Sequence, residues 1–185
     1  TTPRNFVQQV GTATWSSVVS GYGHTIGVRT DGTLWTWGLN LYGQIGNGTT
    51  TNQLTPLQIG TATNWKTVAG GYGHTVAIRT DGTMWSWGRN LEGQLGDGTT
   101  TDRTTPGQVG TATTWATVDA AFGHTVAIRT EGTLWAWGLN DEGELGDGTE
   151  ELRASPVDVL GLTDATTVAV GGKHSCALRS NGHLR

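Results

Sequence analysis

The sequence is poor in charged residues, and those present do not favour a basic surface. Lysine and arginine number 11 against 15 acidic residues, which gives a formal net charge of −4, and charged residues make up only 14% of the chain. Proteins that bind nucleic acids usually carry a basic excess, because they must neutralise phosphates. We therefore expect no nucleic-acid partner.

Cysteine and long apolar runs are also scarce. Cys176 is the only cysteine, so the chain forms no internal disulfide and its sequence indicates no redox compartment. No apolar run has membrane-spanning length, and no targeting segment is recognisable. We expect no membrane partner, and the sequence assigns no cellular compartment.

Glycine and tryptophan, in contrast, are abundant, and both recur at a fixed spacing of 50 residues. The chain has 30 glycines and 9 tryptophans in 185 residues. The spacing links His24, His74, His124 and His174; Arg29, Arg79, Arg129 and Arg179; and Gly32, Gly82, Gly132 and Gly182. It also divides the tryptophans into three sets of three: Trp15, Trp35 and Trp37; Trp65, Trp85 and Trp87; Trp115, Trp135 and Trp137. A fixed period of this length indicates a tandem-repeat architecture.

The period predicts one repeat domain, or a fragment of one, with about 3.5 copies of the unit. The predicted units cover residues 15–64, 65–114 and 115–164, and a partial unit covers residues 165–185. Residues 1–14, with Thr2, Pro3 and Val10, are interpreted as the end of a preceding or closing unit.

Each unit predicts four short strands, here named A to D. In the second unit they are WKTVAG (65–70), HTVAIRT (74–80), TMWSW (83–87) and TPGQV (105–109). Asp81-Gly82 predicts a two-residue hairpin between strands B and C, because glycine tolerates a positive φ. Pro106 lacks an amide donor and suits an edge strand. The glycine and threonine content argues against helices.

Strand B has apolar residues at both alternating sets of positions, as a sheet covered on both faces requires. Four-stranded sheets that repeat at a fixed period and are buried on both sides are typical of β-propeller blades. We therefore predict an all-β fold, a β-propeller with four-stranded antiparallel blades. The alternative is a β-solenoid, whose repeats are usually shorter and lack this hairpin.

The stretch GYGHT-x5-DGTLWTWGLN-x2-GQIGNGT resembles the repeat of the regulator of chromosome condensation family. Three copies match nearly in full, and the fourth, from Gly171 to Arg185, matches only its first half. The resemblance implies a seven-bladed propeller, of which this sequence holds about half. The chain is then either part of a larger ring or a chain whose ends close a ring, within one copy or between copies by self-association.

The loops predict where a partner binds. In antiparallel blades the A–B and C–D loops open on one side, which we name the A–B/C–D rim. The B–C hairpins and D–A links open on the other side and are nearly uniform among the copies, whereas the first rim varies. The candidate partner-binding residues on it are Tyr22, Tyr42, Tyr72, Glu92, Phe122, Asp141, Glu142 and Lys173.

Two interpretations remain open for these residues. The aromatic ones are of a type enriched in interface hot spots, but the same residues would also suit packing between blades. The acidic run between Asp141 and Glu151 would steer a basic partner or, alternatively, form a solvated loop. We interpret Asn47, within the pattern Asn-Gly-Thr, as a turn residue because Asp97 and Asp147 take its place in the next copies.

The sequence indicates no catalytic, cofactor-binding or metal site. It contains no G-x-S-x-G, no H-E-x-x-H and no cysteine-rich metal set. We expect each repeated histidine to bond backbone groups near its own glycine loop, and each repeated arginine to pair with the acidic residue of its hairpin (Asp31, Asp81 or Glu131).

These features favour a non-enzymatic scaffold that binds another protein. The founding members of the resembled family are exchange factors for small GTPases, which is one alternative, but the constant period leaves no room for an inserted element that would open a nucleotide site. Some plant relatives sense ultraviolet light through clustered tryptophans, which is a second alternative. Those relatives carry tryptophan in the G-x-x-H-T motif, where this chain has Tyr22, Tyr72, Phe122 or Lys173. Bacterial relatives include inhibitors of secreted hydrolases, and the nearly identical copies indicate recent duplication or design, with a bacterial source expected.

Overall fold

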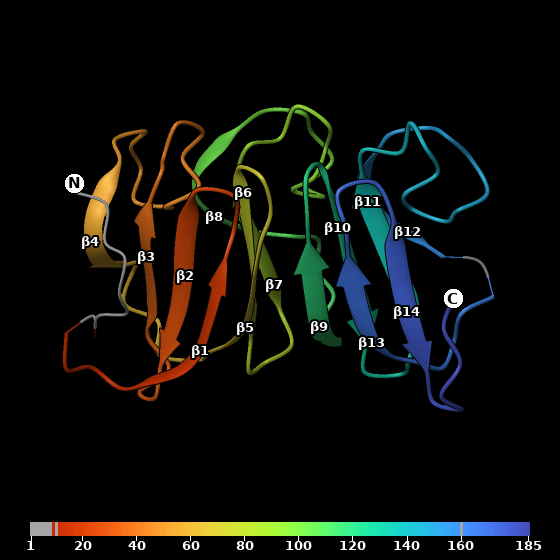
Figure 1. Ribbon diagram of the computed structural model, residues 1–185, viewed down its shortest axis with the longest axis horizontal. Helices are drawn as coiled ribbons and strands as arrows, with labels where there is room; N and C mark the ends of the chain where they lie inside the picture. The colour runs from red at the N-terminus through yellow and green to blue at the C-terminus, as the bar shows by residue number, and fades with distance from the viewer. Residues whose placement is uncertain (1–8, 10, 160) are drawn as a thin grey trace.

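The computed structural model describes residues 9, 11–159 and 161–185, which form β-strands and loops (Figure 1). Blade 1 contains β1 (Trp15–Ser20), β2 (His24–Arg29), β3 (Leu34–Gly38) and β4 (Gln53–Gln58). Blade 2 contains β5 (Trp65–Gly70), β6 (His74–Arg79), β7 (Met84–Gly88) and β8 (Arg103–Gln108). Blade 3 contains β9 (Trp115–Ala120), β10 (His124–Arg129), β11 (Leu134–Gly138) and β12 (Arg153–Asp158). Blade 4 contains β13 (Ala165–Val170) and β14 (Ser175–Arg179).

Each of the first three blades is a four-stranded antiparallel sheet in sequence order, and β13 and β14 form a two-stranded sheet. Figure 1 shows the sheets side by side along the long axis of the molecule. The prediction of an all-β repeat of four-stranded antiparallel sheets is confirmed. Within the described residues, no helix is long and apolar enough to cross a membrane.

The outer strand of blade 2 differs from its predicted bounds. Strand D was expected over residues 105–109, but β8 runs over Arg103–Gln108. Ser86 pairs with Gly107 and Gly88 pairs with Arg103, with a register shift between the two pairs. The strand therefore begins two residues earlier than expected, because the pairing with β7 continues beyond an irregularity that the sequence pattern does not reveal.

The hairpin between strands B and C has three loop residues, so the prediction of a two-residue turn is wrong. Ile78 pairs with Met84, the Arg79 amide donates to the Thr83 carbonyl at 3.0 Å, and the Gly82 amide donates to the Arg79 carbonyl at 3.0 Å. Gly82 has a φ of +76°. A glycine in this conformation at the end of the loop is typical of three-residue hairpins.

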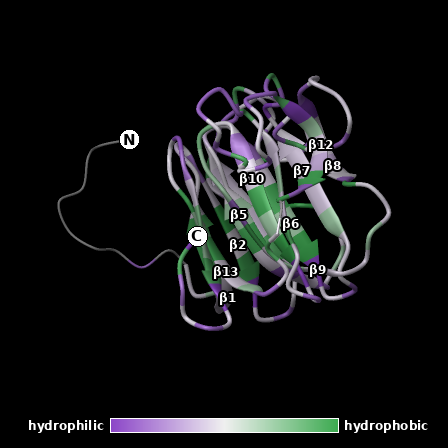
Figure 2. Ribbon diagram, turned by 90° about the vertical axis from the view of Figure 1, so that its right-hand side faces the viewer, coloured by the Kyte–Doolittle hydropathy of each residue, from purple (hydrophilic) through white to green (hydrophobic). Residues whose placement is uncertain are grey.

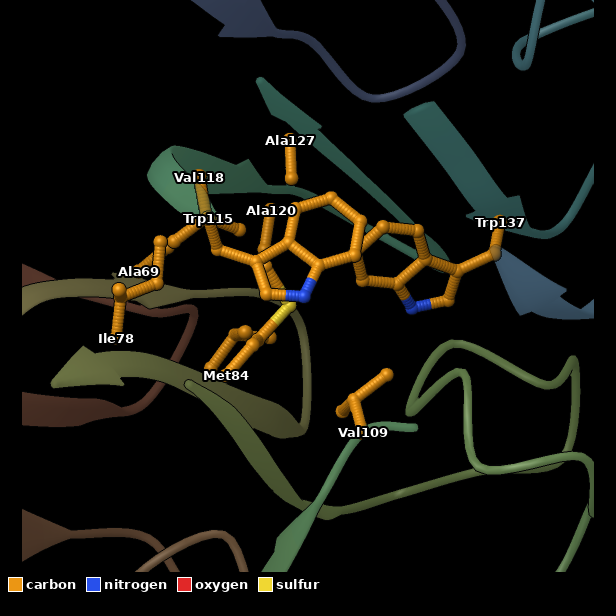
Figure 3. Packing of buried hydrophobic residues seen from close by; sticks show 10 residues of the cluster. Ala69, Ile78, Met84, Val109, Trp115, Val118, Ala120, Ala127 and Trp137 are labelled. Atoms are coloured by element: carbon orange, nitrogen blue, oxygen red, sulfur yellow. The ribbon is translucent and has the colours of Figure 1, made fainter. Parts of the chain in front are cut away.

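The hydrophobic core lies between neighbouring blades. Trp115, Val118 and Trp137 of blade 3 pack against Ile78 and Met84 of blade 2, and Figure 3 shows the two indole rings beside the aliphatic side chains. An equivalent cluster joins blades 1 and 2, and a third cluster of aliphatic residues joins blades 3 and 4. Blades 2 and 3 thus each present a tryptophan-rich face to the preceding blade, whereas the cluster between blades 3 and 4 contains no tryptophan among the described residues. Figure 2 shows hydrophobic residues along the strands and mostly hydrophilic ones in the loops.

Blade 4 continues the repeat beyond its two strands. Leu184 forms an isolated antiparallel bridge with Leu178, and Arg185 exchanges backbone hydrogen bonds with Ala177 at 2.7 and 2.9 Å. Residues 184 and 185 therefore occupy the start of strand C, as expected. The expectation of a D-like strand around Thr2, Pro3 and Val10 falls outside the described residues.

Candidate functional site

The A–B and C–D loops share one rim, as the antiparallel order predicts. A Cβ atom added to Gly73, in the A–B loop of blade 2, would lie 2.7 Å from Cδ2 of Tyr42, in the C–D loop of blade 1. Lys173 Nζ in the A–B loop of blade 4 lies 2.9 Å from Glu142 Oε1 in the C–D loop of blade 3. Each C–D loop therefore contacts the A–B loop of the next blade, and Figure 1 shows these loops along its upper edge.

Three aromatic side chains form a continuous row across this rim. The ring centroids of Tyr22 and Tyr72 lie 4.8 Å apart, and those of Tyr72 and Phe122 lie 5.1 Å apart, in tilted arrangements. Tyr22 is 76% exposed and Phe122 is 47% exposed. The row joins three blades and remains open to solvent, so these residues contact their neighbours and also present apolar surface.

Backbone hydrogen bonds fix the two tyrosines of the row in place. The Tyr22 amide donates to the Gly71 carbonyl at 3.1 Å, and the Tyr72 amide donates to the Ala121 carbonyl at 2.9 Å. These bonds cross from one blade to the next, so the spacing of the rings follows from the spacing of the blades. An aromatic anchor held in this way loses little conformational freedom when a partner binds.

The row ends at blade 4, because Gly172 occupies the position of Tyr22, Tyr72 and Phe122 there. The sequence interpretation placed Lys173 in this slot, and that alignment is wrong by one residue. Lys173 instead takes the position that is glycine in the other blades, and it pairs with Glu142. Their mutual hydrogen bond lowers the pKa of Glu142 and raises the pKa of Lys173, and both side chains are largely exposed.

Arg89 is a rim residue that sequence reasoning missed. Its guanidinium carbon lies 5.8 Å from the Tyr42 ring centroid and 6.0 Å from that of Tyr72, and it forms a bidentate ion pair with Glu92. The equivalent residues are Leu39 and Leu139. The sequence feature that could have identified Arg89 is a charged residue at a position where the other copies carry leucine. Tyr42 and Glu92 are thus largely engaged with neighbouring side chains.

The acidic run on the C–D loop of blade 3 separates into three environments. Asp141 and Glu142 are exposed, whereas Glu144 is only 3% exposed and accepts a hydrogen bond from the Glu142 amide through Oε2. Burial opposes the ionisation of Asp147, but hydrogen bonds from Thr149 and Arg153 outweigh it and lower its pKa to about 2. The exposed acidic surface is therefore smaller than the number of acidic residues in this stretch of sequence suggests.

A buried asparagine makes the C–D loop rigid. In blade 1, the Asn40 amide group donates to the carbonyls of Thr49 and Thr51, and its Oδ1 accepts from the Ile45 amide. Asn47 Oδ1 accepts from the amide and hydroxyl of Thr49 at 3.1 and 2.9 Å. Asp97 and Asp147 make the same contacts, so the interpretation of Asn47 as a turn residue is confirmed.

The repeated histidines connect blades, which corrects the expectation that they bond backbone near their own glycine loops. His24 Nε2 lies 2.9 Å from the Thr75 hydroxyl of the next blade, and that hydroxyl donates to the Gln44 carbonyl. His74 and His124 make the equivalent contacts with Thr125 and Ser175. Burial lowers the pKa of His24 to about 4 and that of His74 to about 3, so both rings are neutral at pH 7.

The repeated arginines stack on tryptophan, so the predicted ion pairs with the hairpin carboxylates are wrong for the first three blades. The Arg29 guanidinium carbon lies 3.5 Å from the Trp35 ring centroid, and Arg79 and Arg129 make equivalent contacts. Asp31 instead accepts hydrogen bonds from Thr33. The guanidinium lies over the face of the indole in a cation–π contact and shields that face from water.

Comparison with protein-family models identifies the repeat. The regulator of chromosome condensation (RCC1) repeat model matches residues 31–78, 81–128 and 131–178, and a second RCC1 repeat model matches residues 15–44, 65–94 and 116–144. The chain belongs to the RCC1 repeat family. The resemblance carried by the glycine, histidine and tryptophan motifs is therefore confirmed.

Solved structures show the same fold at low sequence identity. Prp20p from Saccharomyces cerevisiae is 22% identical with a TM-score of 0.80, over 88% of this chain and 43% of its own. Human WBSCR16 is 22% identical with a TM-score of 0.83, over 96% of this chain and 48% of its own. The RCC1-repeat chain thus spans less than half the length of these two proteins. The predicted propeller architecture, with about 3.5 blades, is confirmed, and the solenoid is not supported.

Proposed function

We propose that this RCC1-repeat chain is a non-enzymatic scaffold that binds a protein partner through its A–B/C–D rim. The observation that carries the proposal is the aromatic row of Tyr22, Tyr72 and Phe122, which is continuous over three blades. Tyr22 and Phe122 are exposed, Tyr72 is half-buried between them, and backbone hydrogen bonds between blades fix the two tyrosines. Exposed apolar surface of this kind marks interaction sites, and aromatic residues dominate binding energy in interfaces.

The chemistry around the row supports a partner with an apolar centre and a polar surround. Arg89 and Glu92 lie beside Tyr72, and the Lys173–Glu142 pair joins the rim loops of blades 3 and 4. Partially exposed charges around an apolar centre give specificity and orientation more than affinity. The row therefore supplies the binding energy, and the charged pairs select the partner.

Structurally similar proteins bind protein partners. The yeast Prp20p structure was described together with its binding to Gsp1p and histones, and yeast Prp20 was also solved bound to Kap60. Because the identity is 22%, the similarity supports a common scaffold rather than common partners. The partner of this chain is accordingly proposed by chemistry, as a protein with a complementary apolar patch.

A triple substitution of the aromatic row tests the proposal. Chains with Tyr22, Tyr72 and Phe122 changed to serine serve as bait in extracts of the source cells, and captured proteins are quantified by mass spectrometry. A matched control changes Asp31 and Asp81 to asparagine and Glu131 to glutamine on the opposite rim. We expect the serine variant to lose at least about tenfold of specific capture, since hot-spot residues each contribute about 2 kcal/mol or more.

The control must capture as the unchanged chain does, and circular dichroism must show all three chains folded. Equal capture by the unchanged chain and the serine variant would exclude the aromatic row as the binding surface. The exchange-factor alternative makes a different prediction, which is faster nucleotide release from a small GTPase. We expect no acceleration, since A strands start at residues 15, 65, 115 and 165, so no element is inserted between blades.

A further inference from the structure

A groove lies at the interface of blades 1 and 2, between their outer strands β4 and β8. Residues 57–62, at the end of β4 and in the D–A link, line it from blade 1, and Trp65, Arg79, Trp85 and Pro106 line it from blade 2. Its volume is about 730 Å³, which is within the range of small-ligand sites. Apolar side chains and indole rings surround a few polar groups here, as in most such sites.

Arg79 is the only charged residue in the described lining of this first groove. Its guanidinium carbon lies 4.4 Å from the Trp65 ring centroid and 4.1 Å from that of Trp85, so two indoles orient it. Its buried Nε has no hydrogen-bond partner, and the side chain forms no ion pair with any described residue. The Asp81 carboxylate of the adjoining hairpin accepts from Thr83 instead. An oriented guanidinium of this kind suits a carboxylate, which it can bind through two parallel hydrogen bonds.

A second groove, at the interface of blades 2 and 3, has the same construction and a different charge. Arg129 stacks on two tryptophans there and contributes to the lining. The lining also contains Asp97, which takes the position of Asn47 in the first groove. Asp97 pairs with Arg103 at 3.3 Å. The second groove therefore carries its own carboxylate, and with a volume of about 310 Å³ it is also smaller.

The exchange of aspartate for asparagine replaces an acceptor by a donor. Asn47 Oδ1 accepts hydrogen bonds from Thr49, so its Nδ2 takes the place of Asp97 Oδ2, the oxygen that faces Arg103. Gln53 in turn occupies the position of Arg103 in blade 1. The first groove thus combines a positive charge with an amide donor, which favours an anion over a cation.

We propose that the first groove is a binding site for a small organic carboxylate with an apolar body. The Arg79 guanidinium binds the carboxylate, and the apolar body packs against Leu57, Trp85 and Pro106. The second groove binds the same ligand more weakly, because Asp97 repels it. The site is separate from the aromatic row, so its test is independent of the proposed scaffold function.

Chemical shifts of the indole N–H groups provide the readout. The probe is 3-phenylpropionate, and the matched neutral control is 3-phenylpropionamide. We expect saturable shifts of the Trp65 and Trp85 signals with the acid, with a dissociation constant of about 1 mM for a probe of this size, and at least about tenfold weaker binding of the amide. Equal affinity for acid and amide, saturable shifts mainly at Trp115 and Trp135 of the second groove, or no saturable shift would overturn the proposal.

A substitution that copies the charge of the second groove provides another test. Asn47→Asp introduces a carboxylate, and because Gln53 replaces Arg103 in blade 1, this carboxylate gains no equivalent partner. We expect binding of 3-phenylpropionate to weaken by about tenfold. Asn52→Asp is the matched control, since it adds the same charge to the same loop outside the groove lining, and Asp102 already takes this position in blade 2. Unchanged affinity in Asn47→Asp, or an equal loss in both variants, would contradict the proposal.

Removal of the guanidinium tests its role. Arg79→Gln should bind acid and amide with equal affinity, whereas Arg129→Gln, which removes the equivalent arginine of the second groove, should keep the preference for the acid. A preference for the acid in a folded Arg79→Gln chain would show that Arg79 does not bind the carboxylate. If Arg79→Gln does not fold, the Asn47→Asp and Asn52→Asp pair decides.

Discussion

At the residue scale, neutral histidines link consecutive blades. His24, His74 and His124 each place Nε2 against a hydroxyl of the next blade, at 2.9, 3.1 and 3.0 Å. The Nδ1 atoms are buried and have no hydrogen-bond partner within the described residues. For His24 and His74, protonation would therefore place a charge with no carboxylate partner inside the interface, and burial lowers the pKa of both rings. Burial also lowers the pKa of His124, although the nearby Glu144 carboxylate opposes this effect.

This arrangement predicts that stability falls as the pH is lowered below about 6.5, the pKa of an unfolded histidine. The folded pKa values are lower, at about 4 for His24 and about 3 for His74, so the unfolded chain binds more protons in this window. Each histidine should cost about 1.4 kcal/mol per pH unit between its unfolded and folded pKa values. Urea unfolding from pH 7.5 to pH 4.5 measures the slope.

The His74→Gln variant provides the control for that prediction. Its amide does not titrate, so the slope between pH 6.5 and pH 4.5 should decrease by the contribution of one proton, or about 1.4 kcal/mol per pH unit. The hairpin carboxylates with lowered pKa values, Asp31 and Asp81, lose their contribution only below about pH 4. A slope identical to that of the unchanged chain would show that His74 does not contribute to the loss of stability in acid.

At the element scale, the glycine of a B–C hairpin can be required for two reasons: its positive φ and its close packing against the next D–A link. Gly82 has a φ of +76°, and a Cβ atom added to it would lie 2.0 Å from the Thr113 carbonyl oxygen in the following D–A link. Gly182 has a φ of +82°, but its added Cβ would meet nothing within 4 Å. A side chain would therefore strain the backbone at both glycines, but only at Gly82 would it also clash with the following D–A link.

We predict that Gly182→Ala destabilises the chain by about 1 kcal/mol through backbone strain alone. Gly82→Ala should cost about 3 kcal/mol, because the backbone of the link must also move. Urea unfolding of the two variants measures the difference. Equal losses of unfolding free energy would mean that the hairpin does not pack against the link as described.

The same scale shows what sequence patterns can and cannot specify. The bounds of β5 and the antiparallel order follow from alternation and from glycine positions, so they were predictable. The three-residue hairpin and the early start of β8 depend on the hydrogen-bond register between strands. The residue pairs Asp81-Gly82 and Thr105-Pro106 do not specify that register. The shared rim followed from strand direction alone.

Contacts between blades were the least predictable feature. Histidine bonding to a hydroxyl 51 residues away, and arginine stacking on tryptophan, depend on how one sheet rotates against the next. Local sequence favoured nearer partners, namely the glycine loop and the hairpin carboxylate. Arg89 was overlooked because its importance comes from two tyrosines on different blades.

At the scale of the whole molecule, the repeat converts similar blades into two different rims. One rim carries hairpins whose sequence hardly varies, and the other carries the aromatic row, the Arg89–Glu92 pair and the Lys173–Glu142 pair. The blades are held by cores between sheets, so substitutions on the rim leave the main stabilising contacts intact. If the rim binds a partner as proposed, stability and recognition depend on different residues of the chain.

A cross-linking scan of both rims tests this account most directly. A photoreactive phenylalanine derivative is placed singly at positions 22, 72 and 122 of the A–B/C–D rim, and at positions 31, 81 and 131 of the opposite rim. After irradiation with extract of the source cells, cross-linked proteins are identified by mass spectrometry. The account predicts a common partner from the first three positions and none from the second three. A partner cross-linked mainly from positions 31, 81 and 131 would contradict it.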